Sequence, residues 1–361
     1  MKQTLQNIAL IVCGLMMSLL LFEAFPRLAP QSLIPRRLRE LGDTMDRNRH
    51  SDEFFLPDRD LLFKIPPHTD FVVHHPDYTM HLKTNLNLPD IGFRGGILGG
   101  PAWGVAVGDS FTFGQGVDQE DTWVAQLAKS IGRDIINFGI PAQGPTQYTR
   151  VLKKYALGMH PQVAFYGFYF NDLDSAARFR RLKRAQLIPI GRYLKYYSYT
   201  YNLVQEVRPS HAQPVLAHAD NAEMSLDPQG LRRTLERQNE KFDERWELTS
   251  REVDEGIRAS KKAGVTFVLL YLPSRWEIYW DTLKKQNNLS DSLDIDRLRR
   301  TVVSYGAKQR ILYLDLTPFL KAEAQKGKQL YFPIDGHLNK EGNRVVAEAI
   351  REFLTRSSLA S

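Results

Sequence analysis

Short apolar runs alternate with segments of helical spacing from residue 104 onward, and this alternation limits the possible folds of the 361-residue chain more than any other feature. The predicted strands are residues 104–107, 134–137, 162–168, 265–271 and 311–315, and the predicted helices are residues 122–130, 146–157, 243–263, 297–307 and 340–354. Asn339 stands where it can cap the last helix. Strands that alternate with helices form parallel sheets covered by helices. We therefore expect an α/β fold with three layers, α/β/α, around a five-stranded parallel sheet.

A long insertion, residues 174–248, separates the third predicted strand from the fourth. Between residues 178 and 208 it carries eight Lys or Arg residues, one Glu and several tyrosines. Its second half is polar, with helical spacing at Leu231, Leu235 and Phe242. Long excursions at the carboxyl edge of a sheet often form lids or shape a substrate site. We expect a lid-like helical insertion.

The first predicted strand ends in the turn Gly108-Asp109-Ser110. Such a turn places Ser110 at the carboxyl edge of the sheet, where open α/β sheets bind ligands. A serine becomes a nucleophile only if a base takes its proton. His337, with Asp335 two residues before it, offers that base and a carboxylate to orient it. The sequence therefore predicts a catalytic triad of Ser110, His337 and Asp335.

Three separated motifs, Gly108-Asp109-Ser110, Asn171-Asp172 and Asp335-x-His337, resemble the SGNH (GDSL-type) hydrolase superfamily. The resemblance runs from about residue 92 to the C-terminus and implies an SGNH/flavodoxin-like fold. The segment 87–95 before the Gly-Asp-Ser turn is similar to that of the membrane-anchored bacterial branch. The two-residue gap between Asp335 and His337 resembles the branch that includes polysaccharide O-acetyltransferases.

The same resemblance implies an oxyanion hole, formed by the backbone N–H of Ser110, the side chain of Asn171 and the loop after the second strand. In that loop Ala142 stands at the position of a family glycine, and Gly139 is a further candidate. An alanine supplies the same backbone donor if its φ is negative, but not if the site needs a positive φ. Tyr169 also replaces a family glycine. Asp109 and Asp172 are expected to accept backbone hydrogen bonds and hold their turns.

The N-terminal residues 8–22 form an unbroken apolar run. At 1.5 Å per residue it spans roughly 22 Å, less than the ~30 Å hydrocarbon core of a bilayer, although Ala24 and Phe25 can extend it. A signal peptide is the alternative, but small residues for cleavage are poorly placed. We expect residues 1–25 to be a membrane anchor, residues 26–100 a stalk with small extended elements, and residues 101–358 the hydrolase domain. The resemblance favours a bacterial inner-membrane protein whose catalytic domain is extracytoplasmic, in the periplasm.

The basic and aromatic half of the insertion has three possible roles. Arg180, Arg181, Arg184 and Tyr193 could bind an anionic polysaccharide, since arginines bind carboxylates and aromatic faces stack on sugars. They could instead contact anionic lipid headgroups, or simply form a lid helix with solvated arginines. A nucleic acid partner is not expected beside an esterase-like site.

The sequence predicts neither a metal site nor a cofactor, because its nine histidines are scattered and it has no phosphate-binding loop. Its only cysteine, Cys13, precludes an intramolecular disulfide. We expect a serine esterase that hydrolyses a short O-acyl ester, such as acetyl, on a small molecule or cell-envelope polysaccharide. Acyl transfer to a sugar hydroxyl through the same triad and a non-catalytic, carbohydrate-binding envelope component are the alternatives.

Overall fold

The computed structural model describes residues 2–52, 55–95, 102–185, 194, 198–207, 215–219, 222–286, 293–357 and 359. The chain divides into two compact units. One comprises residues 1–54 and 182–211, and the other comprises residues 55–181 and 212–361. Each unit is described separately below.

The larger unit is built on a parallel sheet with the strand order β13-β12-β9-β7-β8. These strands are β7 (Gly104–Val107), β8 (Ile135–Asn137), β9 (Val163–Tyr169), β12 (Thr266–Leu272) and β13 (Leu312–Asp315). Each lies within one residue of its predicted range, so the five-stranded parallel sheet is confirmed. Nearly every side chain of β7, β8, β9 and β12 is buried, as expected for strands covered on both faces.

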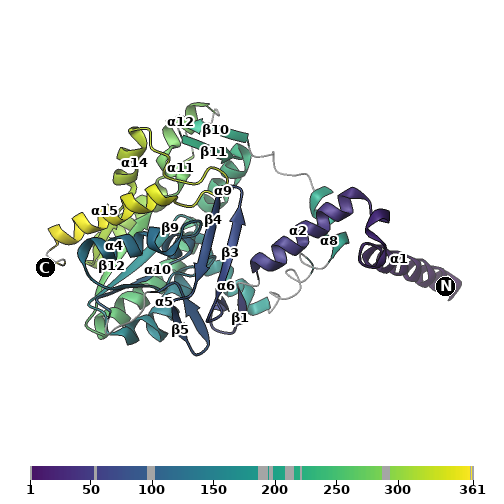
Figure 1. Ribbon diagram of the computed structural model, residues 1–361, viewed down its shortest axis with the longest axis horizontal. Coiled ribbons are helices and arrows are strands. Elements are labelled where there is room, and N and C mark those ends of the chain that lie inside the picture. Colours follow the sequence, from purple (N-terminus) through teal and green to yellow (C-terminus); the bar gives the residue numbers. More distant parts are fainter. Residues whose placement is uncertain are drawn as a thin grey trace. The chain divides into compact units, whose positions relative to one another are not determined.

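Helices cover both faces of this sheet. Figure 1 shows α4 (Trp123–Ile131) beside α15 (Lys340–Arg356) on one face, and α5 (Pro145–Lys154) beside α10 (Phe242–Lys262) on the other. The first pair is joined where the backbone N–H of Trp123 donates to Asn343 Oδ1 at 3.0 Å. Asn339 caps α15, as the sequence predicts, by accepting the Gly342 N–H at 2.9 Å.

The remaining helices of this unit are short or lie at its edges. They are α3 (Ser110–Phe113), η2 (Gln119–Asp121), η3 (Ala156–Met159), α6 (Asp172–Ala185), α9 (Pro228–Glu240), α11 (Arg275–Ile278), α12 (Trp280–Gln286), α13 (Arg297–Gln309) and α14 (Thr317–Gln325). Helix α6 begins in the larger unit and continues into the smaller one. Leu231, Leu235 and Phe242 are all buried, so the helical spacing predicted for the second half of the insertion is confirmed.

Three antiparallel hairpins precede the sheet. They pair β1 (Leu56–Asp58) with β2 (Leu62–Lys64), β3 (Asp70–His75) with β4 (Tyr78–Lys83), and β5 (Leu86–Leu88) with β6 (Ile91–Phe93). The third hairpin joins the core through Phe93, whose ring centroid lies 4.7 Å from that of Phe138. The sequence predicts small extended elements here, and the insertion adds a fourth hairpin, β10 (Val215–Ala219) with β11 (Ala222–Leu226), that it did not predict.

The smaller unit contains α1 (Lys2–Leu28), η1 (Gln31–Leu33), α2 (Arg36–Asp52) and α8 (Tyr199–Val207). Helix α1 contains an 18-residue stretch with a mean hydropathy of 2.4, and residues 3–28 are long and apolar enough to cross a membrane. The helix is longer than the predicted apolar run, and its 27 residues span roughly 40 Å. Its large apolar side chains are exposed, Leu10 by 71%. Helix α2 was not predicted from the sequence.

Candidate active site

The nucleophile turn follows directly from strand β7. The Asp109 carboxylate accepts the Phe111 N–H at 2.9 Å and so caps the single helical turn α3, which begins at Ser110. The turn ends at Gly114, whose φ of 81° lies in the left-handed region that favours glycine. Ser110 is therefore held at the carboxyl edge of the sheet by backbone geometry.

A buried arginine supports the same turn from behind. Arg94, at the end of β6, has no exposed surface, and its guanidinium donates to Gly114 O at 2.8 Å and to Val117 O at 2.7 Å. It also lies over the Phe113 ring, 4.9 Å from its centroid. Burial lowers the pKa of Arg94 to about 10, so the side chain remains charged at neutral pH. The sequence indicated segment 87–95 only by resemblance, and this contact gives it a structural role.

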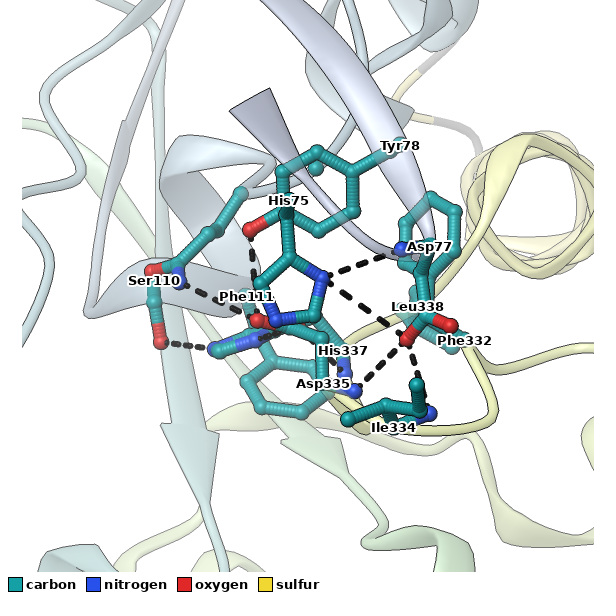
Figure 2. A network of polar contacts seen from close by, with 12 residues as sticks. His75, Asp77, Tyr78, Ser110, Phe111, Phe332, Ile334, Asp335, His337 and Leu338 are labelled. Carbon is teal, nitrogen blue, oxygen red and sulfur yellow. Dashed lines mark hydrogen bonds and ion pairs between the residues drawn. The ribbon is translucent and has the colours of Figure 1, made fainter. Parts of the chain in front are cut away.

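The predicted triad residues come together in the structure. Ser110 Oγ lies 2.7 Å from Nε2 of His337, and Nδ1 of His337 contacts Oδ1 of Asp335 (Figure 2). With the proton on Nδ1, the imidazole donates to the carboxylate and accepts the hydrogen bond of the serine hydroxyl. Although burial raises the pKa of Asp335, its contacts with His337 outweigh this effect and hold the pKa below its ordinary value. This geometry suits removal of a proton from Ser110.

The predicted oxyanion-hole residues have different surroundings. Asn171 stands immediately before α6 with its side chain exposed, and its backbone carbonyl accepts the Ser175 hydroxyl at 3.1 Å. Because β7 and β9 are parallel neighbours, Ser110 and Asn171 both follow strands that end at the same edge of the sheet. Asn171 therefore stays a candidate donor.

Ala142 has a φ of 60°, so the negative φ that would let alanine replace the family glycine without strain is not observed. The alanine itself holds the left-handed conformation, at a cost of about 1 kcal/mol. Arg178 donates to its carbonyl oxygen at 3.0 Å and ties α6 to this loop. The sequence did not indicate this role for Arg178.

Gly139 requires a correction. Its backbone N–H donates to Asn137 Oδ1 at 2.9 Å and is therefore not available to an oxyanion. A Cβ at Gly139 would lie 2.4 Å from the backbone nitrogen of Phe113. Glycine is needed here because the loop approaches the backbone of α3, and Gly139 shapes the site instead of donating to it.

Two buried carboxylates flank the nucleophile turn. Asp172 accepts the Tyr148 hydroxyl at 2.8 Å and the Tyr169 N–H at 2.9 Å. Burial raises the pKa of Asp172 well above its ordinary range and that of Asp109 to about 6. Tyr169, which replaces a family glycine, stacks on Phe111 with centroids 3.8 Å apart. Both carboxylates thus serve the backbone and packing around the site.

The predicted substrate-binding residues are only partly described. Arg180 lies on α6, is 45% exposed and pairs with Glu252 of α10 at 3.9 Å. Arg181 is exposed on the same helix. Tyr193 and the side chain of Arg184 lie outside the described residues.

Two residues near the triad were missed by the sequence analysis. The hydroxyl of Tyr78 donates to Asp335 Oδ2 at 3.2 Å, and Asp77 Oδ2 accepts the Asp335 N–H at 2.7 Å. The Pro76-Asp77 pair signals a turn between two extended segments. Nothing in that signal indicates which distant loop the turn contacts.

One family model matches part of the chain. Residues 232–361 match the family model described as the SGNH hydrolase-like domain of the acetyltransferase AlgX. No curated protein matches the chain.

Several solved structures are similar over about 70% of this chain. A putative lipolytic protein of the G-D-S-L family from Desulfitobacterium hafniense DCB-2 has 16% identity and a TM-score of 0.39, with 98% of its own chain covered. The structure of TesA has 15% identity and a TM-score of 0.40, also with 98% covered. A catalytic mutant of Axe2, an acetylxylan esterase from Geobacillus stearothermophilus, has 12% identity and a TM-score of 0.38, with 95% covered.

The family match includes the Asp335-x-His337 motif, and the Gly-Asp-Ser turn stands opposite it in the structure. Residues 232–361 therefore match an SGNH hydrolase-like domain of the kind described for the acetyltransferase AlgX.

Proposed function

We propose that this protein is a membrane-anchored serine esterase that removes a short acyl group, such as acetyl, from a carbohydrate. The observation that carries the proposal is the 2.7 Å contact between Ser110 Oγ and His337 Nε2, with Asp335 on the opposite ring nitrogen. A serine hydroxyl aligned in this way can pass its proton to the imidazole as it attacks a carbonyl carbon.

The reaction has two stages. In the first, Ser110 Oγ bonds to the acyl carbon, His337 takes the serine proton, and the bond to the sugar oxygen breaks as His337 returns that proton to the leaving alcohol. In the second, His337 takes a proton from water, the hydroxide attacks the acyl-enzyme, and Ser110 is released with its proton restored. Asp335 stabilises the imidazolium in both stages.

The developing oxyanion would be stabilised by the Ser110 N–H and the Asn171 side chain. The Ala142 N–H would be a third donor, because this alanine adopts the left-handed conformation in spite of its cost. Loss of one such donor typically raises the barrier by ~2.7–4 kcal/mol. The exposed side chain of Asn171 leaves its amide accessible to a substrate.

Acyl transfer to a sugar hydroxyl is the second candidate, because the matching family model is that of an acetyltransferase. The two reactions share every step up to the acyl-enzyme and differ in whether water or a sugar hydroxyl resolves it. A non-catalytic carbohydrate-binding role is the third candidate.

We place the protein in a bacterial inner membrane with the catalytic unit in the periplasm, and the N-terminal helix supports the anchoring. Its length and apolar composition suffice for a membrane span. The exposed Arg180 and Arg181 support an anionic polysaccharide as substrate.

Replacement of the nucleophile tests the proposal. The full chain in mild detergent should hydrolyse p-nitrophenyl acetate, and Ser110→Ala should lower kcat at least a thousandfold, because no other group can form the acyl-enzyme. A fluorophosphonate probe should label the wild type at Ser110, as located by peptide mass spectrometry. Ser130→Ala, at an exposed serine on α4, is the matched control and should keep full activity.

Equal turnover by Ser110→Ala would remove Ser110 from the mechanism. A folded wild type that is neither labelled nor active would favour the non-catalytic role. Hydrolase and transferase are separated by adding an acceptor oligosaccharide: a transferase yields acylated sugar in place of free acid.

A further inference from the structure

We infer that the β3–β4 hairpin, through Asp77 and Tyr78 at its turn, positions the Asp335–His337 loop and thereby the general base. This inference rests on the proposed function and extends it to residues outside the α/β domain motifs. Figure 2 shows Asp77 and Tyr78 against the loop that carries Asp335 and His337.

The two oxygens of the Asp335 carboxylate have different partners. Oδ1 faces the loop itself and contacts His337 through both the ring Nδ1 and the backbone N–H, the latter at 3.1 Å. Oδ2 faces the hairpin and accepts the Tyr78 hydroxyl at 3.2 Å, with Gln115 Nε2 more distant at 3.5 Å. Tyr78 therefore restrains the orientation of the Asp335 carboxylate through Oδ2, the oxygen that does not contact His337.

Asp77 holds the backbone of the same loop. Its Oδ2 accepts the N–H groups of Ile334 and Asp335, each at 2.7 Å, and its side chain is only 7% exposed. Hydrogen bonds to an ionised acceptor are about twice as strong as neutral ones. The two residues therefore act on different parts of Asp335: Asp77 on its backbone and Tyr78 on its side chain.

Aromatic packing fixes the hairpin turn against the loop. The Tyr78 ring stacks on His75, with centroids 4.8 Å apart, and contacts Phe332 at 4.9 Å. The Asp77 N–H donates to His75 Nδ1 at 3.2 Å. These two rings restrain the Tyr78 ring and thereby the position of its hydroxyl.

Other contacts hold the backbone before Asp335: Arg275 and the Ser225 N–H both donate to Pro333 O, each at 2.7 Å. The contacts of Asp77 and Tyr78 act on Asp335 itself. Gly336 has a φ of 83°, and Ile334 is half exposed. A carboxylate only two residues before the histidine must turn back to reach the ring, so its orientation depends on contacts from outside the loop. The hairpin lies outside the matched residues 232–361 and before the Gly-Asp-Ser turn.

The test is a double-mutant cycle in the full chain with p-nitrophenyl acetate. Tyr78→Phe should lower kcat roughly tenfold with KM changed less than twofold, because a hydrogen bond to a charged group is lost while the substrate contacts remain. In an Asp335→Asn background the same change should lower the rate less than twofold, since Tyr78 acts only through Asp335. The rate of fluorophosphonate labelling at Ser110 gives a second readout for slow variants.

Two further variants sharpen the test. Asp77→Asn keeps an acceptor oxygen and should retain more of kcat than Asp77→Ala, and thermal unfolding shows whether the alanine variant is folded. Tyr313→Phe, on the edge strand β13, is the matched control and should behave as wild type.

A wild-type kcat in Tyr78→Phe would overturn the inference. So would a loss of kcat from Tyr78→Phe that is equally large in the wild type and in the Asp335→Asn background. Either result would leave the triad in place. Full activity in Ser110→Ala would instead overturn the proposed function and this inference with it.

Discussion

At the scale of single residues, Glu277 is a fully buried acid that forms no ion pair with the part of the chain that the structure describes. Its carboxylate accepts the Tyr271 hydroxyl at 2.6 Å, and the Ser274 N–H and hydroxyl at 2.7 and 2.9 Å. Burial raises its pKa from 4.5 to about 7 against the effect of these hydrogen bonds. The group therefore binds its proton more tightly in the folded chain than in the unfolded chain.

This shift predicts a pH-dependent contribution to stability. The contribution is fully present below pH 4.5, where both states are protonated, and is lost as the pH rises through 7, where the folded state must hold a buried anion. Its full size is about 3 kcal/mol.

Glu277→Gln cannot ionise, so the stability advantage of the wild type over this variant should be larger at pH 5 than at pH 8. Thermal unfolding of both proteins in detergent at the two pH values measures it. A difference in melting temperature that grows with pH would contradict the predicted shift.

At the scale of elements, the site depends on two chain segments that contact α3. The loop after β8 approaches it closely at Gly139, and Asn137 Nδ2 donates to Thr112 O at 2.8 Å. Arg94 holds its C-terminal end. We expect a small change in either of them to move Ser110.

Gly139→Ala should therefore impair activity without touching a triad residue. The added Cβ would lie 2.4 Å from the Phe113 nitrogen and 2.8 Å from the Thr112 carbonyl carbon, and backbone atoms cannot yield as a flexible side chain can. Overpacking of this kind costs roughly 1–3 kcal/mol. We expect at least a tenfold lower kcat and a lower melting temperature.

Gly158→Ala is the control, because a Cβ there meets no atom within 4 Å. Equal activity of the two alanine variants would show that the loop does not position α3.

At the scale of the whole molecule, the chain forms a larger unit that carries the candidate site and a smaller unit. The smaller unit is built from two segments that are distant in the sequence, residues 1–54 and 182–211. In that second unit, Glu23 of α1 accepts the N–H groups of Tyr199 and Thr200 at 3.0 and 2.8 Å, and the Ser198 hydroxyl at 2.7 Å. One carboxylate of the N-terminal helix thus caps α8 within the insertion, and Arg27 lies 5.0 Å from the centroid of the Tyr199 ring.

Removal of this cap should loosen α8. A helix cap is worth about 1 kcal/mol, so Glu23→Ala should raise the hydrogen-exchange rates of the α8 amides roughly fivefold. Glu40→Ala on α2, whose side chain is 61% exposed, is the control. Unchanged α8 exchange in Glu23→Ala would show that the helix does not depend on α1.

The sequence by itself determined the sheet, its main helices and the pairing of Ser110 with His337 and Asp335 as candidates. The sheet and helices depend on local signals: apolar periodicity marks strands and helices, and a turn residue such as Gly108 marks where a strand ends. Such signals lie within about ten residues of one another, so they can be recognised without knowledge of the rest of the fold.

The tertiary structure alone decided which partners complete the site. Tyr78 and Asp335 are 257 residues apart, and no periodicity links them. Gly139 was misassigned because sequence alone cannot show whether a backbone N–H is already used, and here Asn137 accepts it. A buried donor or acceptor is paired with whichever group the packed chain brings within about 3 Å of it. Which group that is depends on the whole fold.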